Sequence, residues 1–169
     1  MPNEYNVMRN EEVRYSGPFD FEDLYHHLME WFGRRQYAVR EKKFKDKIKP
    51  RAPIQREIEV EWEVKKDVDD YTIFRYTVGF RIVNVKDILV KTDEGEKKMF
   101  DADIRVLINA DLVLDKQDKW ETSPLLHFLK RFFEAHIYKS TLKHHETILY
   151  KEGQALYNEV KALLKLYNM

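Results

Sequence analysis

REIEVEWEVKK, residues 56–66, alternates four glutamates with four apolar side chains without a break. Successive side chains of a β-strand point to opposite faces of its sheet, so this alternation predicts a strand with one apolar and one acidic face. We interpret the glutamates as the solvent side of a sheet. We favour this interpretation over the alternative, in which Glu59 and Glu61 are catalytic carboxylates or a cation site.

Two further segments show the same alternation, and the turn-like stretches KKDVDDY and KTDEGEK separate the three. This arrangement predicts an antiparallel meander. In the first hairpin, a register that pairs Trp62 with Tyr76 places apolar residues opposite one another and sets Glu63 against Arg75. In the second hairpin, a register that pairs Tyr76 with Leu112 selects the same apolar face.

The run from Tyr71 to Lys91 is longer than an ordinary strand, which spans about 17–20 Å. The alternation falters at Asn84 and Lys86, where a straight strand would place polar side chains on the apolar face. We therefore predict a bulge or a sheet corner near residues 83–85. A strongly curved sheet leaves a concave side that helices can cover.

An amphipathic helix is predicted before the meander, in the stretch SGPFDFEDLYHHLMEWFG. Asp20 suits the N-cap, and Gly33 suits the left-handed position after the last turn. EEVRYS predicts a short strand before this helix, and QYAVREKKFKDKI predicts a strand after it, with Tyr37 and Val39 pointing inward. The apolar side of the helix comprises Phe21, Leu24, Tyr25, Leu28, Trp31 and Phe32.

The pattern becomes helical after Trp120, where Ser123 and Pro124 suit the N-cap and the first helical position. Either one long helix bends near Ser140, or two helices meet there; we favour two, because Ser140 and Thr141 are suitable caps. The first apolar stripe, expected to face the core, comprises Leu125, Phe128, Leu129, Phe132 and Ile137. The second, heptad-like stripe comprises Leu142, Leu149, Leu156, Val160, Leu163 and Tyr167, and is interrupted by Glu152 and Gly153.

Composition bounds the class of protein. A chain of 169 residues most simply forms one domain, residues 1–169. It contains no cysteine, which excludes disulfides and thiolate metal sites. Its 30 basic residues balance 30 acidic ones, so the net charge predicts no general attraction to nucleic acid or anionic lipid, although it does not exclude a locally charged patch. We expect a cytoplasmic protein without a membrane-spanning segment. Charged residues make up 36% of the chain, with only five glycines, which is common in proteins of thermophiles.

Two HH pairs raise the question of a metal site. Neighbours on a helix point in different directions, so an adjacent pair cannot chelate a metal from one face. A better set is Glu22, His26 and Glu30, joined by His144 or His145, which would suit zinc or iron. The HExxH motif and the repeated ExxH of diiron bundles are both missing from the sequence, so we predict no metal and no cofactor.

Other candidate chemistry has simpler interpretations. The sequence has no glycine-rich phosphate loop and no GxSxG elbow, and we predict no catalytic residue. The basic stretch REKKFKDKIKPR, residues 40–51, could follow nucleic-acid phosphates, but we favour an edge strand whose lysines discourage pairing between sheets. An exposed sheet face also explains the alternating acids Asp101, Asp103, Asp111 and Asp115.

The order of a helix, long antiparallel strands and terminal helices resembles, at the level of architecture only, the helix-grip arrangement of START-like domains. There a curved sheet grips a C-terminal helix and often encloses an apolar ligand. We predict the α+β class: a long curved antiparallel meander packed on one face by the N-terminal helix and the C-terminal helices. The number of strands is low for that superfamily, the second C-terminal helix is additional, and fold does not determine function.

The function we favour is a non-enzymatic binding domain that holds an apolar small molecule or a partner segment between the sheet and the C-terminal helices. The predicted ligand-binding residues are Trp62, Tyr76, Phe80 and Phe132. One alternative is a structural module that forms homo-oligomers through the stripe from Leu142 to Tyr167. A second alternative is an enzyme or metal protein with an unrecognised site.

Overall fold

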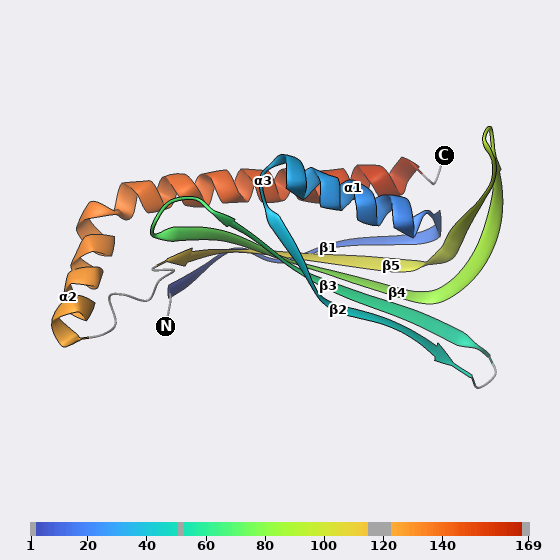
Figure 1. Cartoon of the computed structure of the whole chain (residues 1–169), viewed down its shortest axis with the longest axis horizontal. Helices are drawn as coiled ribbons and strands as arrows, with labels where there is room; N and C mark the ends of the chain where they lie inside the picture. The colour runs from blue at the N-terminus through green and yellow to red at the C-terminus, as the bar shows by residue number, and fades with distance from the viewer. Residues whose placement is uncertain (1–2, 51–52, 115–122, 167–169) are drawn as a thin grey trace.

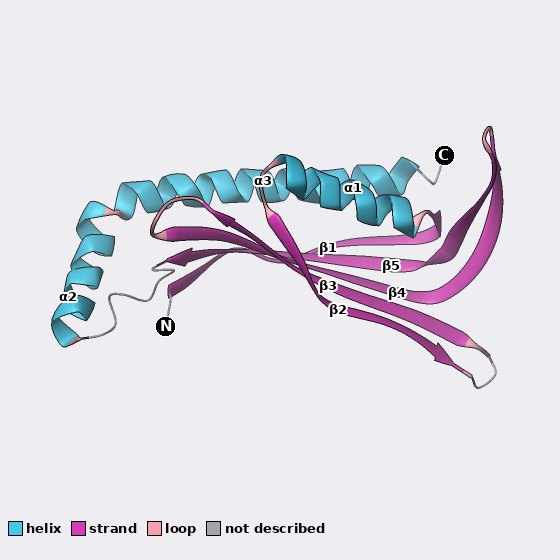
Figure 2. Cartoon of the chain, viewed as in Figure 1, coloured by secondary structure: helices cyan, strands magenta, loops and turns pink. Residues whose placement is uncertain are grey.

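A computed structural model describes residues 3–50, 53–114 and 123–166 of the chain, in which a five-stranded antiparallel sheet packs against helices. The strands are β1 (Asn3–Phe19), β2 (Ala38–Lys49), β3 (Gln55–Asp67), β4 (Thr72–Thr92) and β5 (Gly95–Leu114). The helices are α1 (Phe21–Arg34), α2 (Pro124–Phe132), the π-helix η2 (Phe133–Ile137) and α3 (Lys139–Leu166). The sheet order is β1-β5-β4-β3-β2, and α1 and α3 lie together on one side of the sheet (Figures 1 and 2). The predicted α+β class is confirmed.

Alternation along β3, β4 and β5 builds the core as predicted, because every second side chain of their central parts is apolar and faces the helices. α1 adds Leu24, Leu28 and Phe32 to this core, and all three are fully buried. The buried apolar residues on the inner face of these three strands are Ile58, Val60, Trp62, Val64, Phe74, Tyr76, Val78, Phe80, Ile82, Ala102, Ile104, Val106, Ile108, Ala110, Leu112 and Leu114.

The predicted strand registers are wrong by two residues in both hairpins. Trp62 lies opposite Val78 rather than Tyr76, and Tyr76 lies opposite Ala110 rather than Leu112. A shift of two residues leaves every side chain on the same face, so the apolar face survives the error. The first shift follows from the turn, where the Asp69 carboxylate accepts hydrogen bonds from the backbone N–H groups of Tyr71 and Thr72.

The predicted bulge in β4 is confirmed. Val83 pairs with Asp103 and the next paired residue is Lys86, opposite Asp101. Asn84 lies in the left-handed region with φ of 56°, and its amide donates a 2.9 Å hydrogen bond to the carboxylate of Asp103. Beyond this bulge the hairpin of β4 and β5 curls toward the helical side of the molecule (Figure 1).

α1 begins as predicted and ends differently. The Asp20 side chain accepts a 3.1 Å hydrogen bond from the Asp23 amide, which confirms the N-cap. Gly33 does not take the left-handed position, which belongs to Gln36 with φ of 64°. The chain turns there because the Tyr37 amide bonds the Phe32 carbonyl at 3.0 Å, bringing the Tyr37 ring into the core.

The N-terminal strand is much longer than the predicted EEVRYS, because β1 pairs with β5 over most of its length. Tyr37 and Val39 point inward as expected, although Val39 is only half-buried. β2 lies at the sheet edge, which confirms the edge-strand interpretation of the basic stretch.

The C-terminal region divides into two helices, but not at the predicted caps. Ser123 accepts a 3.2 Å hydrogen bond from the Leu126 amide and is the N-cap of α2, as predicted. The break is the π-helix η2, and Ser140 and Thr141 lie inside α3. At Gly153, α3 approaches the sheet so closely that a Cβ would lie 2.2 Å from the Met8 sulfur. The interruption in the apolar stripe is therefore where the helix meets β1.

Candidate functional site

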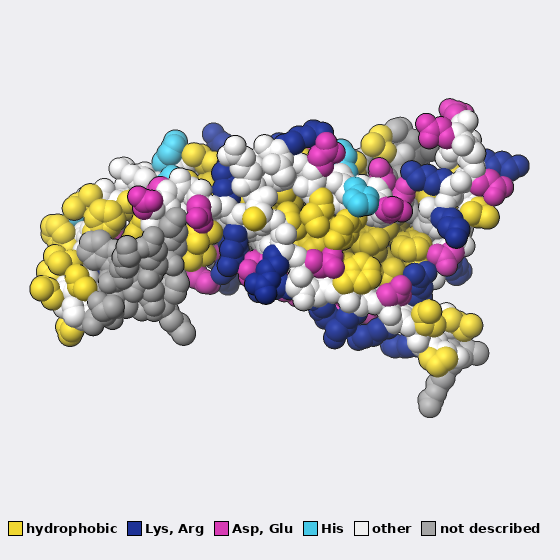
Figure 3. Space-filling view, in the orientation of Figure 1, with side chains coloured by type: hydrophobic (Ala, Val, Ile, Leu, Met, Phe, Trp, Pro, Cys, Tyr) yellow, Lys and Arg dark blue, Asp and Glu magenta, His cyan; other side chains and the backbone are white. Residues whose placement is uncertain are grey.

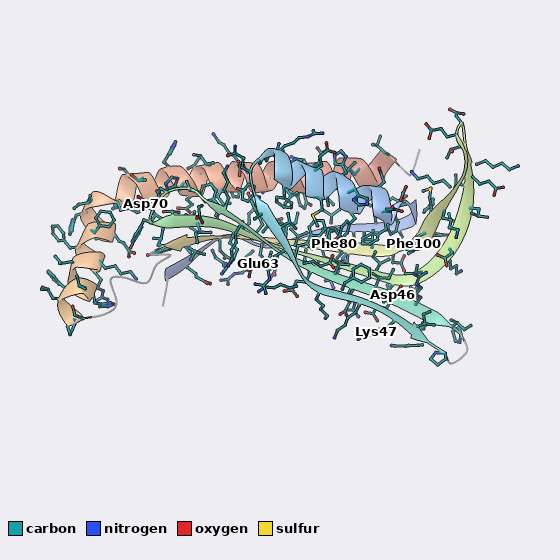
Figure 4. All side chains as sticks on the ribbon, viewed as in Figure 1. Asp46, Lys47, Glu63, Asp70, Phe80 and Phe100 are labelled. Carbon is teal, nitrogen blue, oxygen red and sulfur yellow. The ribbon has the colours of Figure 1, made fainter. Side chains whose placement is uncertain are left out.

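Three of the four predicted ligand-binding residues, Trp62, Tyr76 and Phe80, lie in the sheet core. The rings of Trp62 and Phe80 are 4.9 Å apart, and the ring of Tyr25 contacts Trp62 at 4.9 Å. Figure 4 labels Phe80 beneath α1. Aromatic packing therefore occupies the space next to Trp62 and Phe80 in which a ligand was expected.

Tyr76 packs in a separate part of the same core. Its ring contacts Phe32 at 5.8 Å and Tyr37 at 5.5 Å, and its hydroxyl donates a 3.0 Å hydrogen bond to the Leu149 carbonyl of α3. Burial raises the pKa of Tyr76 above its ordinary range, so the hydroxyl stays protonated and keeps donating. Tyr76 thus fixes α3 to the sheet.

The fourth predicted residue, Phe132, does not join the others. It lies on α2 with half of its surface exposed, and its ring contacts His136 at 4.8 Å.

Phe132 belongs to an exposed apolar surface, the α2 stripe, that was expected to pack on the core. Leu125 is 68% exposed, Phe128 64% and Phe132 50%. Figure 3 shows hydrophobic side chains gathered at the end of the molecule formed by α2. The prediction that this stripe faces the core is wrong, because α3 covers the sheet with its own stripe and α2 turns away from that line (Figure 1). The α2 stripe comprises Leu125, Phe128, Leu129, Phe132 and Ile137.

The orientation of α2 is set by contacts at its junction with α3. Phe133 stacks on Tyr138 with ring centroids 5.4 Å apart, and Tyr71 of the turn between β3 and β4 contacts both rings. The Tyr71 hydroxyl donates a hydrogen bond to Glu134, and Lys130 is only 1% exposed. One side of the α2–η2 segment is therefore held against the body of the protein, while the α2 stripe points outward.

Asp69 connects this junction to the sheet. Besides the amides of its own turn, it accepts hydrogen bonds from the Tyr138 hydroxyl at 3.0 Å and from His145 Nε2 at 3.1 Å. Burial raises the pKa of Asp69, but these hydrogen bonds outweigh burial and leave the pKa below its ordinary value. Burial is also the main reason that the pKa of Tyr138 rises to about 12. The Asp69 carboxylate thus joins the turn between β3 and β4 to the N-terminal part of α3 and the residue before it.

The residues predicted as candidate metal ligands do not come together in one site. His26 lies 3.8 Å from Glu22, but Glu30 pairs with Arg34 at 2.6 Å. Within the described ranges, no three His, Asp or Glu side chains are grouped to hold a metal ion. The neighbouring His27 contacts Glu159 of α3 at 2.7 Å and so joins the two helices.

The outer sheet face, which the helices leave uncovered, carries paired charges. The predicted contact between Glu63 and Arg75 is wrong, since Glu63 lies opposite Thr77 and pairs with Lys42 at 2.7 Å. Arg75 instead binds the Glu4 carboxylate through two hydrogen bonds of 2.9 Å, which raise the pKa of Arg75.

Asp111 is not an exposed acid as expected. It is buried between β1 and β4, where it contacts Arg75 at 3.1 Å and accepts a hydrogen bond from Asn6. Asp115 lies outside the described residues.

Two shallow pockets of 340 and 240 Å³ lie on this outer face and share Arg81 and Arg105. Their cations already have partners: Arg81 pairs with Glu57 at 2.9 Å, and Arg105 pairs with Glu12 at 2.5 Å. Hydrogen bonds from Arg105 and Arg14 lower the pKa of Glu12 to about 2, so this carboxylate stays charged at neutral pH. Any anion entering here would displace an existing partner.

The hairpin of β2 and β3 forms an arm, the β2–β3 arm, which extends beyond the helices (Figure 1). Lys45, Lys47 and Lys49 alternate along β2 and are exposed, so they share the outer face. Ile48 and Ile54 are exposed at the tip. Figure 4 labels Asp46 and Lys47 on this arm, and Asp46 pairs with Arg56 at 2.8 Å.

Comparison with known proteins finds no match: no protein family, no curated protein and no solved structure matches this chain. Among the described helices, none is both long enough and apolar enough to cross a membrane.

Proposed function

We propose that this protein is a non-enzymatic binding domain that lies on the surface of a phospholipid bilayer through the α2 stripe. The observation that carries the proposal is a row of large apolar side chains, exposed on a helix whose junction with α3 is anchored by buried contacts. The apolar partner predicted from the sequence then lies outside the protein rather than between sheet and helices.

The energetic argument starts from the size of the exposed side chains. Transferring one Phe or Leu side chain from water to an apolar phase contributes about 1.5–3 kcal/mol. Contiguous apolar patches on soluble proteins usually mark contact surfaces. Partial insertion of Leu125, Phe128 and Phe132 into the bilayer would therefore add several such increments to the free energy of binding. The cost of immobilising the protein on the surface reduces this sum.

Charge favours a bilayer over a second copy of the chain. α2, with the sequence PLLHFLKRF, contains no acidic residue, and Arg131 is exposed. Two α2 helices packed face to face would offer this arginine no acidic residue of α2, whereas lipid phosphates complement its charge. An apolar face bordered by an exposed cation suits the bilayer interface.

The position of α2 also suits a flat surface. α2 forms one end of the molecule along its longest axis (Figure 1), and its apolar side chains project there (Figure 3). The heptad-like stripe, the predicted oligomer contact, is occupied instead: Leu149, Leu156 and Val160 are fully buried within the chain itself. Tyr167 lies outside the described residues.

The test is co-sedimentation with phosphatidylcholine vesicles. We expect the wild-type protein to sediment with the vesicles, and the double variant Phe128→Asp with Phe132→Asp to stay in the supernatant. Leu89→Asp is the matched control, because Leu89 is 63% exposed on the arm formed by β4 and β5, away from α2. It should sediment like the wild type.

Two outcomes would overturn the proposal. One is equal sedimentation of the wild type and the α2 double variant, provided that both show the same circular dichroism spectrum. The other is a wild-type dimer in analytical ultracentrifugation that the double variant converts to a monomer, since the stripe would then bind a second copy.

A second candidate function, binding of a small apolar ligand near Trp62, is favoured by one observation. Trp62 Nε1 is buried and has no hydrogen-bond partner among the described residues. Tyr25, which covers it, is only half-buried and its hydroxyl donates to Glu41. A ligand with an oxygen acceptor that displaced Tyr25 would satisfy the indole N–H.

The test of this second candidate is titration with oleate. It should change the tryptophan fluorescence of the wild type, and Trp62→Phe should remove the saturable part of that change. A fluorescence change that rises linearly with oleate, without saturation, would exclude the site.

A further inference from the structure

We infer that the α2 stripe selects anionic phospholipids at mildly acid pH, and that His136, beside Phe132, is the side chain that provides this selectivity. The inference rests on the proposed function and adds a lipid class and a pH dependence to it. Separate observations carry it: the position of His136, the lack of any partner for its ring other than Phe132, and the excess of cations over acids around it.

His136 lies on the same outward side as the α2 stripe. It follows Phe132 by four residues, about one helical turn, and the two rings are 4.8 Å apart. His136 is exposed, as is its neighbour Ile137 of the stripe. Glu134 and Tyr138 lie on the other side, where Tyr138 is buried and Glu134 accepts a hydrogen bond from Tyr71. A bilayer that covers Phe132 therefore also meets His136.

The ring nitrogens of His136 are available to solvent and to a lipid headgroup. They make no hydrogen bond and no ion pair with the described part of the chain, so no protein group competes for them. Imidazole gains a proton, and with it a positive charge, as the pH falls from about 8 to about 5. At mildly acid pH the α2 stripe therefore gains a cation that can meet a lipid phosphate.

The sequence around the stripe is poor in acids. Residues 123–145 contain four lysines and arginines and four of the six histidines of the chain, but only one acid, Glu134. Arg131 is exposed next to Phe132 and makes no ion pair with any described residue. An anionic surface that approached the stripe would therefore meet Arg131 first, and His136 as a second cation once the ring is protonated.

The elements packed against η2 add few acids. Asp69, in the turn between β3 and β4, is engaged by Tyr138 and His145. Figure 4 labels its neighbour Asp70 on the sheet side of α2. The titratable and charged groups that surround η2 are Lys130 and Arg131 of α2, Lys139 of α3, Asp69 and Asp70 of the turn, and Tyr5 of β1. Both acids of the turn lie on the body side of η2, away from the stripe.

The expected size of the effect is that of one added cation. A cation close to an anionic bilayer contributes about fivefold in affinity. Protonation of His136 should therefore tighten binding to anionic vesicles about fivefold, and added salt should weaken this gain because the charge is exposed. Phosphatidylcholine has no net charge, so protonation should not tighten binding to it.

The experiment is vesicle co-sedimentation at about pH 7.5 and about pH 5.5, on either side of the pH range in which imidazole titrates. Vesicles of phosphatidylcholine are compared with equimolar vesicles of phosphatidylglycerol and phosphatidylcholine, because phosphatidylglycerol keeps its charge at both pH values. His136→Gln should lack about fivefold of the wild-type gain in affinity for the mixed vesicles at the lower pH. His136→Arg, which is always charged, should bind them at the higher pH about as tightly as the wild type does at the lower pH.

His26→Gln is the matched control. His26 is exposed on α1, far from α2 along the longest axis of the molecule (Figure 1). This variant should keep the whole wild-type gain in affinity at the lower pH. Circular dichroism spectra should be the same for all three histidine variants and the wild type, since both histidines are exposed.

The outcomes separate this inference from the proposal on which it rests. If the α2 double variant loses binding to phosphatidylcholine but His136→Gln keeps the whole gain on mixed vesicles, the inference fails and the proposed function stands. If the wild type sediments with neither kind of vesicle at either pH, the proposed function fails as well. An equal gain on phosphatidylcholine and on the mixed vesicles would overturn the selectivity for anionic lipid.

Discussion

Two leucines of the C-terminal helices provide a sharp test of the packing, because the same substitution should lower stability strongly at one position and hardly at the other. Leu156 of α3 is fully buried in the core, whereas Leu125 of α2 is mostly exposed. Both belong to apolar helical stripes, and the sequence pattern treats them alike. We expect Leu156→Ala to destabilise the protein strongly and Leu125→Ala to leave its stability almost unchanged.

The magnitude follows from burial. Replacing a buried leucine by alanine costs about 2–5 kcal/mol, because transfer energy is lost and a cavity remains. The upper part of this range applies to Leu156, since the surrounding core of sheet and helices is closely packed and cannot collapse into the space. An exposed substitution such as Leu125→Ala should change the free energy of unfolding by less than about 0.5 kcal/mol.

The assay is urea unfolding followed by tryptophan fluorescence. With a slope of about 2 kcal/mol per molar urea, Leu156→Ala should lower the midpoint by about 1.8–2.5 M. Leu125→Ala should lower it by less than about 0.3 M on the same slope. Equal losses for the two variants would refute the assignment of Leu156 to the core and Leu125 to the surface.

Three further predictions concern single contacts. Tyr76→Phe should lower the free energy of unfolding by about 1 kcal/mol, measured by urea unfolding, because it removes the hydrogen bond to the Leu149 carbonyl. Gln36→Gly should raise it by about 0.5–1 kcal/mol, because glycine accepts the left-handed backbone at that position. The pKa of Asp69 lies below its ordinary value of 3.8, so its stabilising contribution is complete above that pH and is lost as pH falls through the lowered pKa. Acid titration of the unfolding midpoint should therefore show a smaller decline in Asp69→Asn than in the wild type; an equal decline would exclude this contribution.

The parts of the fold that depend on local pattern were predictable. Alternation around Trp62 identified the inner face of the sheet, and the faltering pattern at Asn84 identified the bulge. Asp20 and Ser123 were correctly identified as helix caps. N-capping depends only on a short polar side chain and the first turn of the helix that follows it, and both can be read from the local sequence.

The strand registers depend on the geometry of turns and bulges, which the alternation of apolar and polar residues does not specify. The Asp69 carboxylate fixes the turn between β3 and β4 by accepting from two amides of that turn. The bulge after Val83 changes the register within β4 itself. The resulting two-residue shifts near Trp62 and Tyr76 leave the apolar face unchanged, so a pattern based on faces alone cannot detect them.

The surface formed by α2 could not be assigned from the sequence, because an apolar stripe looks the same whether it packs inward or outward. Either apolar stripe, that of α2 or that of α3, is suited to cover the sheet face. In the structure α3 covers it, through Leu149, Leu156 and Val160. The lack of any acid in α2 was a usable signal that was not recognised. The π-helix that redirects the chain at residues 133–137 has no simple sequence signature.

The most direct test of the proposed α2 contact uses the fact that the chain contains no cysteine. Phe128→Cys and Leu89→Cys can each be labelled with one environment-sensitive fluorophore, in otherwise identical proteins. On addition of phosphatidylcholine vesicles, the label at position 128 should shift to the blue and be quenched by brominated acyl chains, while the label at position 89 should not respond. An unchanged spectrum at position 128 in vesicle-bound protein would show that α2 is not the membrane contact.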